Sequence, residues 1–502
     1  MAQAPHLLSL EYTEPNDGHI TNYAYHDFVL AMTGYQNYLQ YYPNITDFKF
    51  NLYIYNNNNQ LVKLSVPPNA KNYGVFNISA ILQDRVKTDE EGYVVESKGG
   101  LSDQSTHNGV TMTSKPHAIH QIDKYARNKQ NMEFFNFAMN CDFFSNGIYY
   151  ESGVYFPKLT TKANLLPFYA VWNACLPFRE EQEGMNLSSI HFMGNQTKRF
   201  LTNKRAASDR NVTYSDYETL AFFNGTFQYQ TGGHGGGQLI QLGSSIVHSI
   251  RVVAFGTNGF TLDIPNVAAN CGSYNPIFQY PNPNNQYPAT SDEGLLYVGV
   301  GPKNLTNSDI LDNNGNPVTI ATWSGITHYH VYAINSSGNQ KSEIIIFNVI
   351  PQNCQYERIR LAYLNRLGGY DYINLTKKSI ETTEITRSNY KAHYGYLPIQ
   401  NANLGINTNN KWEYGSYEGG TRSYNVNAIT TIEANSDFLN EHDAENLKEL
   451  FTSPVTYIQI GDKFEPVVCT EKNYVLQTTD NDKLKQYIIG IQFGHEQRIQ
   501  RL

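Results

Sequence analysis

Short stretches in which hydrophobic and polar residues strictly alternate are the clearest pattern in this chain, and they predict β-strands with one buried face. Residues 48–55 are the best example, because every second side chain is large and apolar. These side chains are Phe48, Phe50, Leu52 and Ile54. A run of asparagines at 56–59 favours a turn, and Leu61–Val66 then returns as the expected partner strand.

The same pattern predicts further strands along the first 352 residues. They are expected at 74–79, 134–138, 149–156, 165–172, 246–255, 294–300, 327–334 and 343–349. The last two stretches flank the turn-forming residues 335–339, which predicts a β-hairpin. Residues 81–84 are compatible with one short helical turn.

The pattern over residues 359–375 predicts a strand, a glycine turn and a second strand. Both Gly368 and Gly369 can adopt positive φ without strain, which suits a tight turn. The stretch contains no nucleophile and no metal cluster. The polar residues Asn365, Arg366 and Asp371 lie beside the double glycine, and we expect them to brace the turn rather than to bind a ligand.

One helix is predicted near residues 440–452. Asn440 can cap it, and Ser453-Pro454 ends it. Its apolar stripe consists of Ala444, Leu447, Leu450 and Phe451. A hairpin over 455–468 and a final strand over 485–493 are expected to follow, and we expect Tyr487–Phe493 to be an edge strand that can pair with a neighbouring chain.

These elements predict a mainly β protein built from several β-sandwich domains of immunoglobulin or fibronectin-III type, with a few short helices. We expect an N-terminal β-sandwich at 1–98 and a β-rich middle domain or insertion at 99–280. A fibronectin-III-like sandwich is expected at 281–352. A C-terminal mainly-β domain, which carries the helix, is expected at 353–502.

Composition adds that the chain has few charges and many aromatic residues. It has 502 residues, of which 16% are charged, and 37 Lys and Arg against 45 Asp and Glu give a net charge of −8. This balance argues against a nucleic-acid partner, which needs a basic face. The 38 tyrosines fit either the base composition of an AT-rich genome or large protein interfaces, where Tyr is enriched and charge is depleted.

Neither a membrane nor a cofactor is expected. No run of 18 apolar residues occurs, and Met1–His6 lacks the features of a secretory signal, so we expect synthesis in a cytoplasm. The five cysteines are far apart and form no CxxC pair, which argues against a zinc site and against a disulfide framework.

Motifs with possible chemistry all have a simpler structural explanation. His328-Tyr329-His330 lacks a third metal ligand, and the glycines at 232–237 lack the pattern of a phosphate loop. Residues 309–316 match a calcium loop poorly, and a type I′ turn at Asn314-Gly315 explains them better. No pair of carboxylates is spaced as the acid and base of a glycosidase, so we expect no enzyme.

Two parts of the chain resemble virion structural proteins of tailed bacteriophages, of the kind found in phages of Bacteroidota, including crAss-like phages, and of marine bacteria. The resembling segments are Phe48-Lys49-Phe50, Val66-Pro67-Pro68-Asn69 and Tyr73–Ser79 within 47–84, then Arg360–Tyr372, Ser453-Pro454-Val455 and Glu465-Pro466-Val467-Val468. The resemblance covers about half of the chain, and residues 100 to 280 lie outside it.

The resemblance implies a non-catalytic part of the virion tail: a baseplate, tail-tip or fibre-attachment protein. It implies other tail proteins as partners and a homo-oligomer, such as a symmetric ring. An alternative is a tail protein that binds a host receptor or surface glycan, with Trp172, Trp323 and Trp412 stacking on sugars. A capsid-associated protein and a polysaccharide depolymerase are further alternatives.

Overall fold

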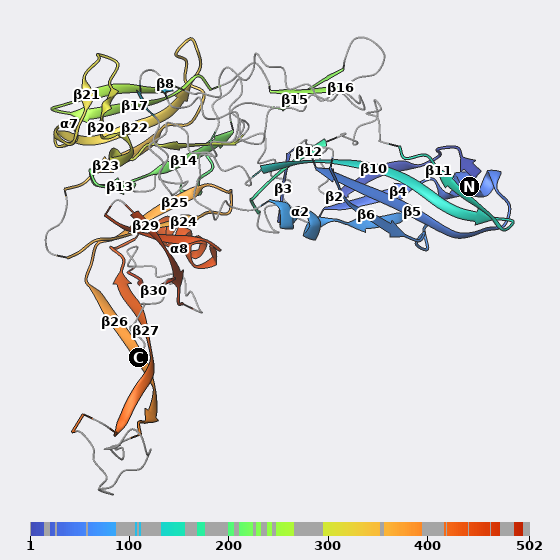
Figure 1. Cartoon of the computed structure of the whole chain (residues 1–502). Coiled ribbons are helices and arrows are strands. Elements are labelled where there is room, and N and C mark those ends of the chain that lie inside the picture. The colour runs from blue at the N-terminus through green and yellow to red at the C-terminus, as the bar shows by residue number, and fades with distance from the viewer. Residues whose placement is uncertain are drawn as a thin grey trace, which may run out of the picture. The chain divides into compact units, whose positions relative to one another are not determined.

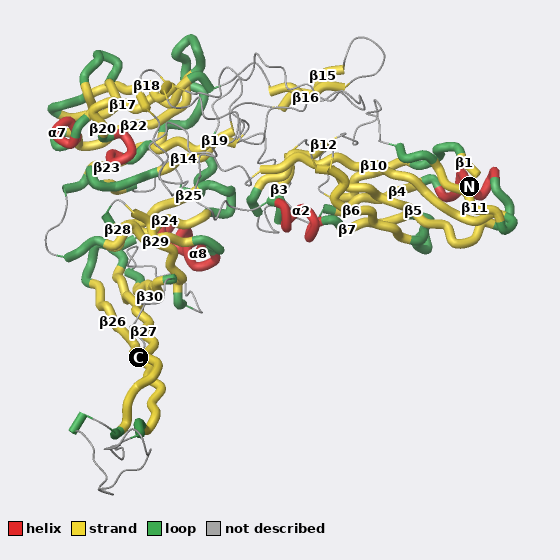
Figure 2. Tube along the Cα trace, viewed as in Figure 1, coloured by secondary structure: helices red, strands yellow, loops and turns green. Residues whose placement is uncertain are grey.

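The structure is a computed structural model, and strands predominate among the residues that it describes (Figures 1 and 2). The described residues are 2–14, 21–25, 28–56, 59–86, 106–107, 110–111, 132–155, 168–175, 199–204, 210–223, 227–231, 238–242, 247–265, 295–351, 356–393, 416–417, 419–439, 441–461, 463–471 and 486–494. The fold is therefore mainly β, as the alternation predicts. Among these residues no helix is long and apolar enough to cross a membrane.

The chain forms two compact units. The first consists of residues 1–352 together with Tyr363–Tyr372, and the second consists of Asn353–Ala362 together with Ile373–Leu502. The short segment Tyr363–Tyr372 thus belongs to the first unit although both of its flanks belong to the second.

The N-terminal part of the first unit contains a seven-stranded and a three-stranded sheet. In the larger sheet, five strands follow one another in the order β1 (Ala2–Ala4), β11 (Ile148–Ser152), β10 (Met132–Ser145), β12 (Phe168–Trp172) and β3 (Thr21–Tyr23). In addition, β5 (Ile45–Asn56) pairs with β10, and β6 (Asn59–Val66) pairs with β5. The smaller has the order β2 (Ser9–Glu14), β4 (Val29–Thr33) and β7 (Gly74–Asn77), and the helices here are α1 (Tyr35–Tyr41) and α2 (Ser79–Arg85).

Residues of these two sheets share one hydrophobic core. The predicted inward face of β5 is confirmed, because Phe48, Phe50, Leu52 and Ile54 are all buried. They cluster with Leu30 and Met32 of β4 and with Phe137 and Met139 of β10. Burial of one such side chain contributes roughly 1.5–3 kcal/mol, so this apolar face specifies the register of β5.

The rest of the first unit is built on a five-stranded sheet. Its order is β13 (Asn211–Val212), β23 (Ile345–Val349), β22 (Ile326–Ile334), β17 (Ser249–Gly256) and β18 (Phe260–Pro265). Two-stranded pairs are β14 (Thr219–Phe223) with β19 (Leu295–Gly299), β15 (Phe227–Thr231) with β16 (Gln238–Leu242), β20 (Asn307–Leu311) with β21 (Pro317–Val318), and β8 (Thr106–His107) with β9 (Val110–Thr111). The helices here are α6 (Pro302–Leu305) and α7 (Ile320–Trp323).

A second hydrophobic core lies against the five-stranded sheet. Trp323 is fully buried in it and meets Phe260 and Tyr329 edge to face, each at 5.2 Å between ring centroids. Leu220 of β14 and Val298 of β19 belong to the same core. The predicted hairpin over 327–349 is present as β22 and β23.

The second unit is built on a seven-stranded sheet and one helix. The strand order is β25 (Tyr370–Leu375), β24 (Ile359–Leu364), β28 (Thr456–Ile460), β29 (Lys463–Cys469), β30 (Ile488–Phe493), β27 (Thr421–Asn435) and β26 (Ser379–Lys391). The predicted helix is present as α8 (Glu441–Thr452), with Ala444, Leu447 and Leu450 buried. Its expected cap, Asn440, lies outside the described residues.

Two expectations about strand placement need correction. The final strand β30 is not an edge strand, because it lies between β27 and β29. Alternating hydrophobic residues mark a strand with one buried face and do not tell an edge strand from a central one. The sheets also cross the expected boundaries at 98 and 280, since β5 pairs with β10 and β17 pairs with β22.

Candidate functional site

The turn between β24 and β25 is a five-residue loop that its own backbone closes. The Asn365 amide donates to the Gly369 carbonyl at 2.8 Å, and the Gly368 amide donates to the Asn365 carbonyl at 3.1 Å. Gly368 has a φ of 83°, which a glycine adopts without strain. We call residues 365–371 the hairpin tip.

The side chain of Asn365 braces this tip from within. Its Oδ1 accepts hydrogen bonds from the amides of Leu367 at 2.9 Å and Gly369 at 3.1 Å. Its Nδ2 donates to the Leu201 carbonyl at 3.1 Å and to Asp371 Oδ2 at 2.9 Å. Asn365 is only 3% exposed, and these four bonds satisfy the amide group that the tip buries.

Asp371 is a buried carboxylate that is held by donors on a distant segment. It is 2% exposed and accepts hydrogen bonds from the Thr202 hydroxyl and from the Asn203 amide, the latter at 3.2 Å. Together with the bond from Asn365, these contacts compensate for the loss of water around the carboxylate. Arg366 contacts the same segment, since its Nε donates to Asn203 Oδ1 at 3.1 Å.

Gly369 is needed for a reason other than the expected one. Of the two glycines, only Gly368 has positive φ. A Cβ atom on Gly369 would instead come closer than 3.0 Å to the carbonyl oxygen of Leu201, a distance that real Cβ atoms essentially never show. The backbone of Leu201 therefore approaches the tip so closely that only glycine fits.

The backbone carbonyls of the tip are bound as well. Three consecutive ones accept hydrogen bonds from two other segments of the first unit. Within 168–175, the Cys175 amide donates to Arg366 at 2.8 Å and Trp172 Nε1 donates to Leu367 at 3.3 Å; the Tyr297 hydroxyl donates to Gly368 at 2.7 Å. Chemically, this arrangement can hold the tip in place. Trp172 is fully buried here, as is Trp323 in its own core, so neither can stack on a sugar as expected, and Trp412 lies outside the described residues.

The same turn occurs at three other places in the described part of the chain, and the sequence pattern was not used to predict them. In each, the side-chain oxygen of an Asx residue accepts from the amides two and four residues later, and the third residue on has positive φ. These turns start at Asn69, Asp312 and Asn335. The turn at Asp312 is thus not of type I′, because Gly315 has positive φ and Asn314 does not. The sequence signal for this turn is an Asn or Asp that is followed three residues later by Gly or Asn.

The two histidines on β22 form the second candidate. The rings of His328 and His330 lie 5.5 Å apart between centroids, and Phe255 of β17 stacks on His328 at 4.8 Å. Burial and the neighbouring His328 both lower the pKa of His330. In the part of the chain that the structure describes, no group of three or more His, Cys, Asp or Glu residues is placed to hold a metal ion.

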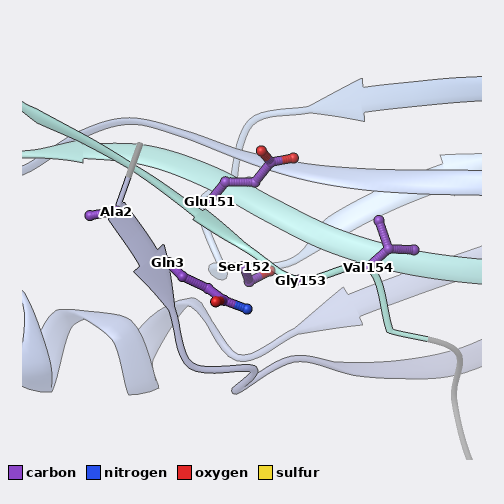
Figure 3. Close-up of a pocket in the computed structure, with 6 residues that line it drawn as sticks. All are labelled: Ala2, Gln3, Glu151, Ser152, Gly153 and Val154. Carbon is purple, nitrogen blue, oxygen red and sulfur yellow. The ribbon is translucent and has the colours of Figure 1, made fainter.

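A small open pocket lies at the end of the β1–β11 pair, with a volume of about 310 Å³. It is lined by Ala2, Gln3, Glu151, Ser152, Gly153 and Val154, and Figure 3 shows the side chains of Gln3 and Glu151 pointing in different directions. Two of its polar side chains are already bonded within the protein, because Glu151 accepts from Asn140 and Ser152 accepts from the Cys141 amide, both at 2.9 Å. We assign no ligand to this pocket.

The other candidate motifs give no site. The glycine run at 232–237 and the acidic stretches at 89–91 and 180–183 lie outside the described residues. Among the described cysteines, Cys141, Cys175 and Cys469 are free thiols. Burial raises the pKa of the Cys469 thiol to about 12, so it is a poor nucleophile at neutral pH.

Comparisons with known proteins do not assign the chain. No protein-family model matches it, and no curated protein is significantly similar to it in sequence.

Proposed function

We propose that this protein is a non-catalytic structural component of a tailed-phage virion, most directly a tail, baseplate or fibre-attachment protein. The hairpin tip carries the proposal. It lies in the segment that resembles phage tail proteins, and its side chains Asn365, Arg366 and Asp371 and three of its carbonyls bond to other segments of the same chain. Such a network serves rigidity, and rigidity is what a scaffold in a virion needs.

The arrangement of the sheets supports immunoglobulin- or fibronectin-III-like sandwiches as the building blocks. Each of the two cores in the first unit draws residues from more than one sheet, and packing of sheets on a shared core is the defining feature of a β-sandwich. In this proposal the sandwiches act as rigid spacers that hold other tail proteins in register.

Exposed tyrosines support a protein that works through its surface. Of the tyrosines that the structure describes, Tyr417 is 79% exposed, and Tyr41, Tyr424 and Tyr25 are at least half exposed. Tyrosine provides large contact area at low entropic cost and is enriched at interfaces. These residues fit other virion tail proteins and further copies of this chain as partners, including a ring.

A receptor- or glycan-binding tail protein is the second candidate. The same exposed tyrosines favour it, because their rings are accessible to solvent and could stack on sugars. It loses the support of Trp172 and Trp323, which are buried.

Mass spectrometry of purified virions, followed by separation of heads from tails, tests the proposal. We expect the chain in intact particles and in the tail fraction, with the major capsid protein as the control for head contamination. Its absence from virions, or its recovery with the heads, would refute the tail placement. Binding on a glycan array would favour the second candidate.

A further inference from the structure

The hairpin of β26 and β27, which we call the arm, has the features of an unfilled pairing site. Among the described strands, β26 pairs with β27 alone and forms the end of its sheet (Figure 1). β26 runs for 13 residues without proline or glycine. The one shift of pairing register within the arm places its extra residue on β27 and leaves β26 regular. The outer backbone groups of β26 thus form a long, regular edge.

Much of the arm stands apart from the rest of its sheet. Among the described residues, the next strand, β30, pairs with Thr431–Asn435 of β27 and no further, so the pairs from Thr383–Thr430 to Lys391–Thr421 form a two-stranded ribbon there. A two-stranded ribbon is marginally stable in water on its own. Apolar side chains are also exposed along β26: Ile380 and Ile385 at 50% and Tyr390 at 41%. Addition of a strand at this edge would stabilise the arm.

The charges on β26 indicate which strand can be added. Its acidic residues, Glu381 and Glu384, precede its basic residues, Arg387 and Lys391. We infer that β26 pairs antiparallel with β26 of a second copy of this chain, with Glu381 of each copy opposite Lys391 of the other. Two such ion pairs form at once, because the contact has two-fold symmetry.

Other alignments of the two strands are less favourable. A parallel pairing in register would set each charged residue against its own copy, and like charges directly opposite one another destabilise a sheet. Antiparallel pairings centred on Glu384 or Arg387 would do the same at the centre. The pairing centred on Thr386 sets Glu381 opposite Lys391, Glu384 opposite Ser388 and Ile385 opposite Arg387, and it has no like-charge pair.

This inference rests on the proposed function in one respect, that copies of the chain meet one another. A two-fold contact joins copies in pairs, so a ring requires a second, different contact. The inference can fail while the virion role holds, because an arm that binds another tail protein would leave the full-length chain monomeric in solution but present in virions.

Sedimentation equilibrium of the full-length chain tests the pairing with charge reversals. The variant E381K sets Lys against Lys twice, and K391E sets Glu against Glu twice, so we expect each to weaken self-association by on the order of tenfold or more. An equimolar mixture of the two variants restores complementary pairs, and so does the double variant E381K/K391E. We therefore expect both to regain dimers.

The variant E433K is the matched control, because Glu433 is an exposed residue of β27 that lies opposite Ile380, outside the inferred pairing. It carries the same change of charge and is expected to associate like the wild type. A monomeric wild-type chain would overturn the inference. Single variants that associate as strongly as the wild type, or that fail to recover on mixing, would overturn it too.

Discussion

The carbonyl oxygen of Leu201 occupies the space that a Cβ atom of Gly369 would need. These two residues are far apart in the chain, and the backbone of one is pressed against the backbone of the other. The contact makes the hairpin tip a fixed point of the first unit, together with the bonds from Trp172, Tyr297 and the Asn203 segment.

Replacement of Gly369 by alanine should therefore destabilise the first unit. The added methyl group forces the tip away from Leu201, and overpacking of this kind costs about 2–3 kcal/mol. Gly338 provides the control, because it has a φ of 78° and open space around it. G338A should cost only about 1–2 kcal/mol through the backbone conformation. Differential scanning calorimetry should show the larger fall in melting temperature for G369A; equal shifts would contradict the close approach.

Asn365 and Asn335 offer a second matched comparison. Both accept from the amides two and four residues later, but only Asn365 also donates to Leu201 and Asp371 in a buried setting. N335A should cost about 1 kcal/mol, and N365A about 2–4 kcal/mol, because it leaves buried polar groups unpaired. Urea unfolding followed by fluorescence measures both. Similar losses would mean that the bonds to Leu201 and Asp371 contribute little.

The hydroxyl of Tyr297 should contribute measurably to the same tip. Y297F removes a single oxygen, and with it a buried hydrogen bond to the Gly368 carbonyl, which costs about 1–3 kcal/mol. Y390F, on the exposed arm, serves as the control and should be within about 0.5 kcal/mol of the wild type. A neutral effect of Y297F would show that the tip tolerates the loss of one of its three carbonyl bonds.

The lowered pKa of His330 predicts how stability depends on pH. Below the ordinary value of 6.5 the unfolded chain takes up a proton that the folded chain resists. The free energy of unfolding should thus fall as the pH drops below about 6.5 and level off below the folded pKa. H330Q should remove this contribution, and H328Q should reduce it, because His328 helps to lower the pKa. Melting temperatures between pH 7 and pH 5 test this, and identical profiles for all three proteins would contradict it.

The local alternation of hydrophobic and polar residues was enough to predict where strands form, but not which segments they contact. Alternation predicted β5 and its buried side chains, since one face of a strand is readable from its own residues. It gave no sign that Thr202 and Asn203 would bind Asp371, because that contact depends on how the chain folds back. For the same reason, β30 was expected at an edge and lies inside its sheet.

The role of the hairpin-tip residues could be predicted in part from the sequence. Asn365 lies three residues before Gly368, a spacing that the turns at Asp312 and Asn335 share, so the bracing of the turn is a local property. The need for glycine at 369 is not local, because it comes from Leu201. Trp172 shows the same limit. As a tryptophan it was expected to stack on a sugar, and only the fold shows that it is buried against the tip.

A cryo-EM map of the whole virion is the most direct test of the central proposal that this chain is a structural part of a phage tail. The proposal predicts that the two units fit density in the tail or baseplate, in several symmetry-related copies, with the arm in contact with a neighbouring subunit. Density for the chain on the capsid alone, or a complete virion map without it, would contradict the proposal.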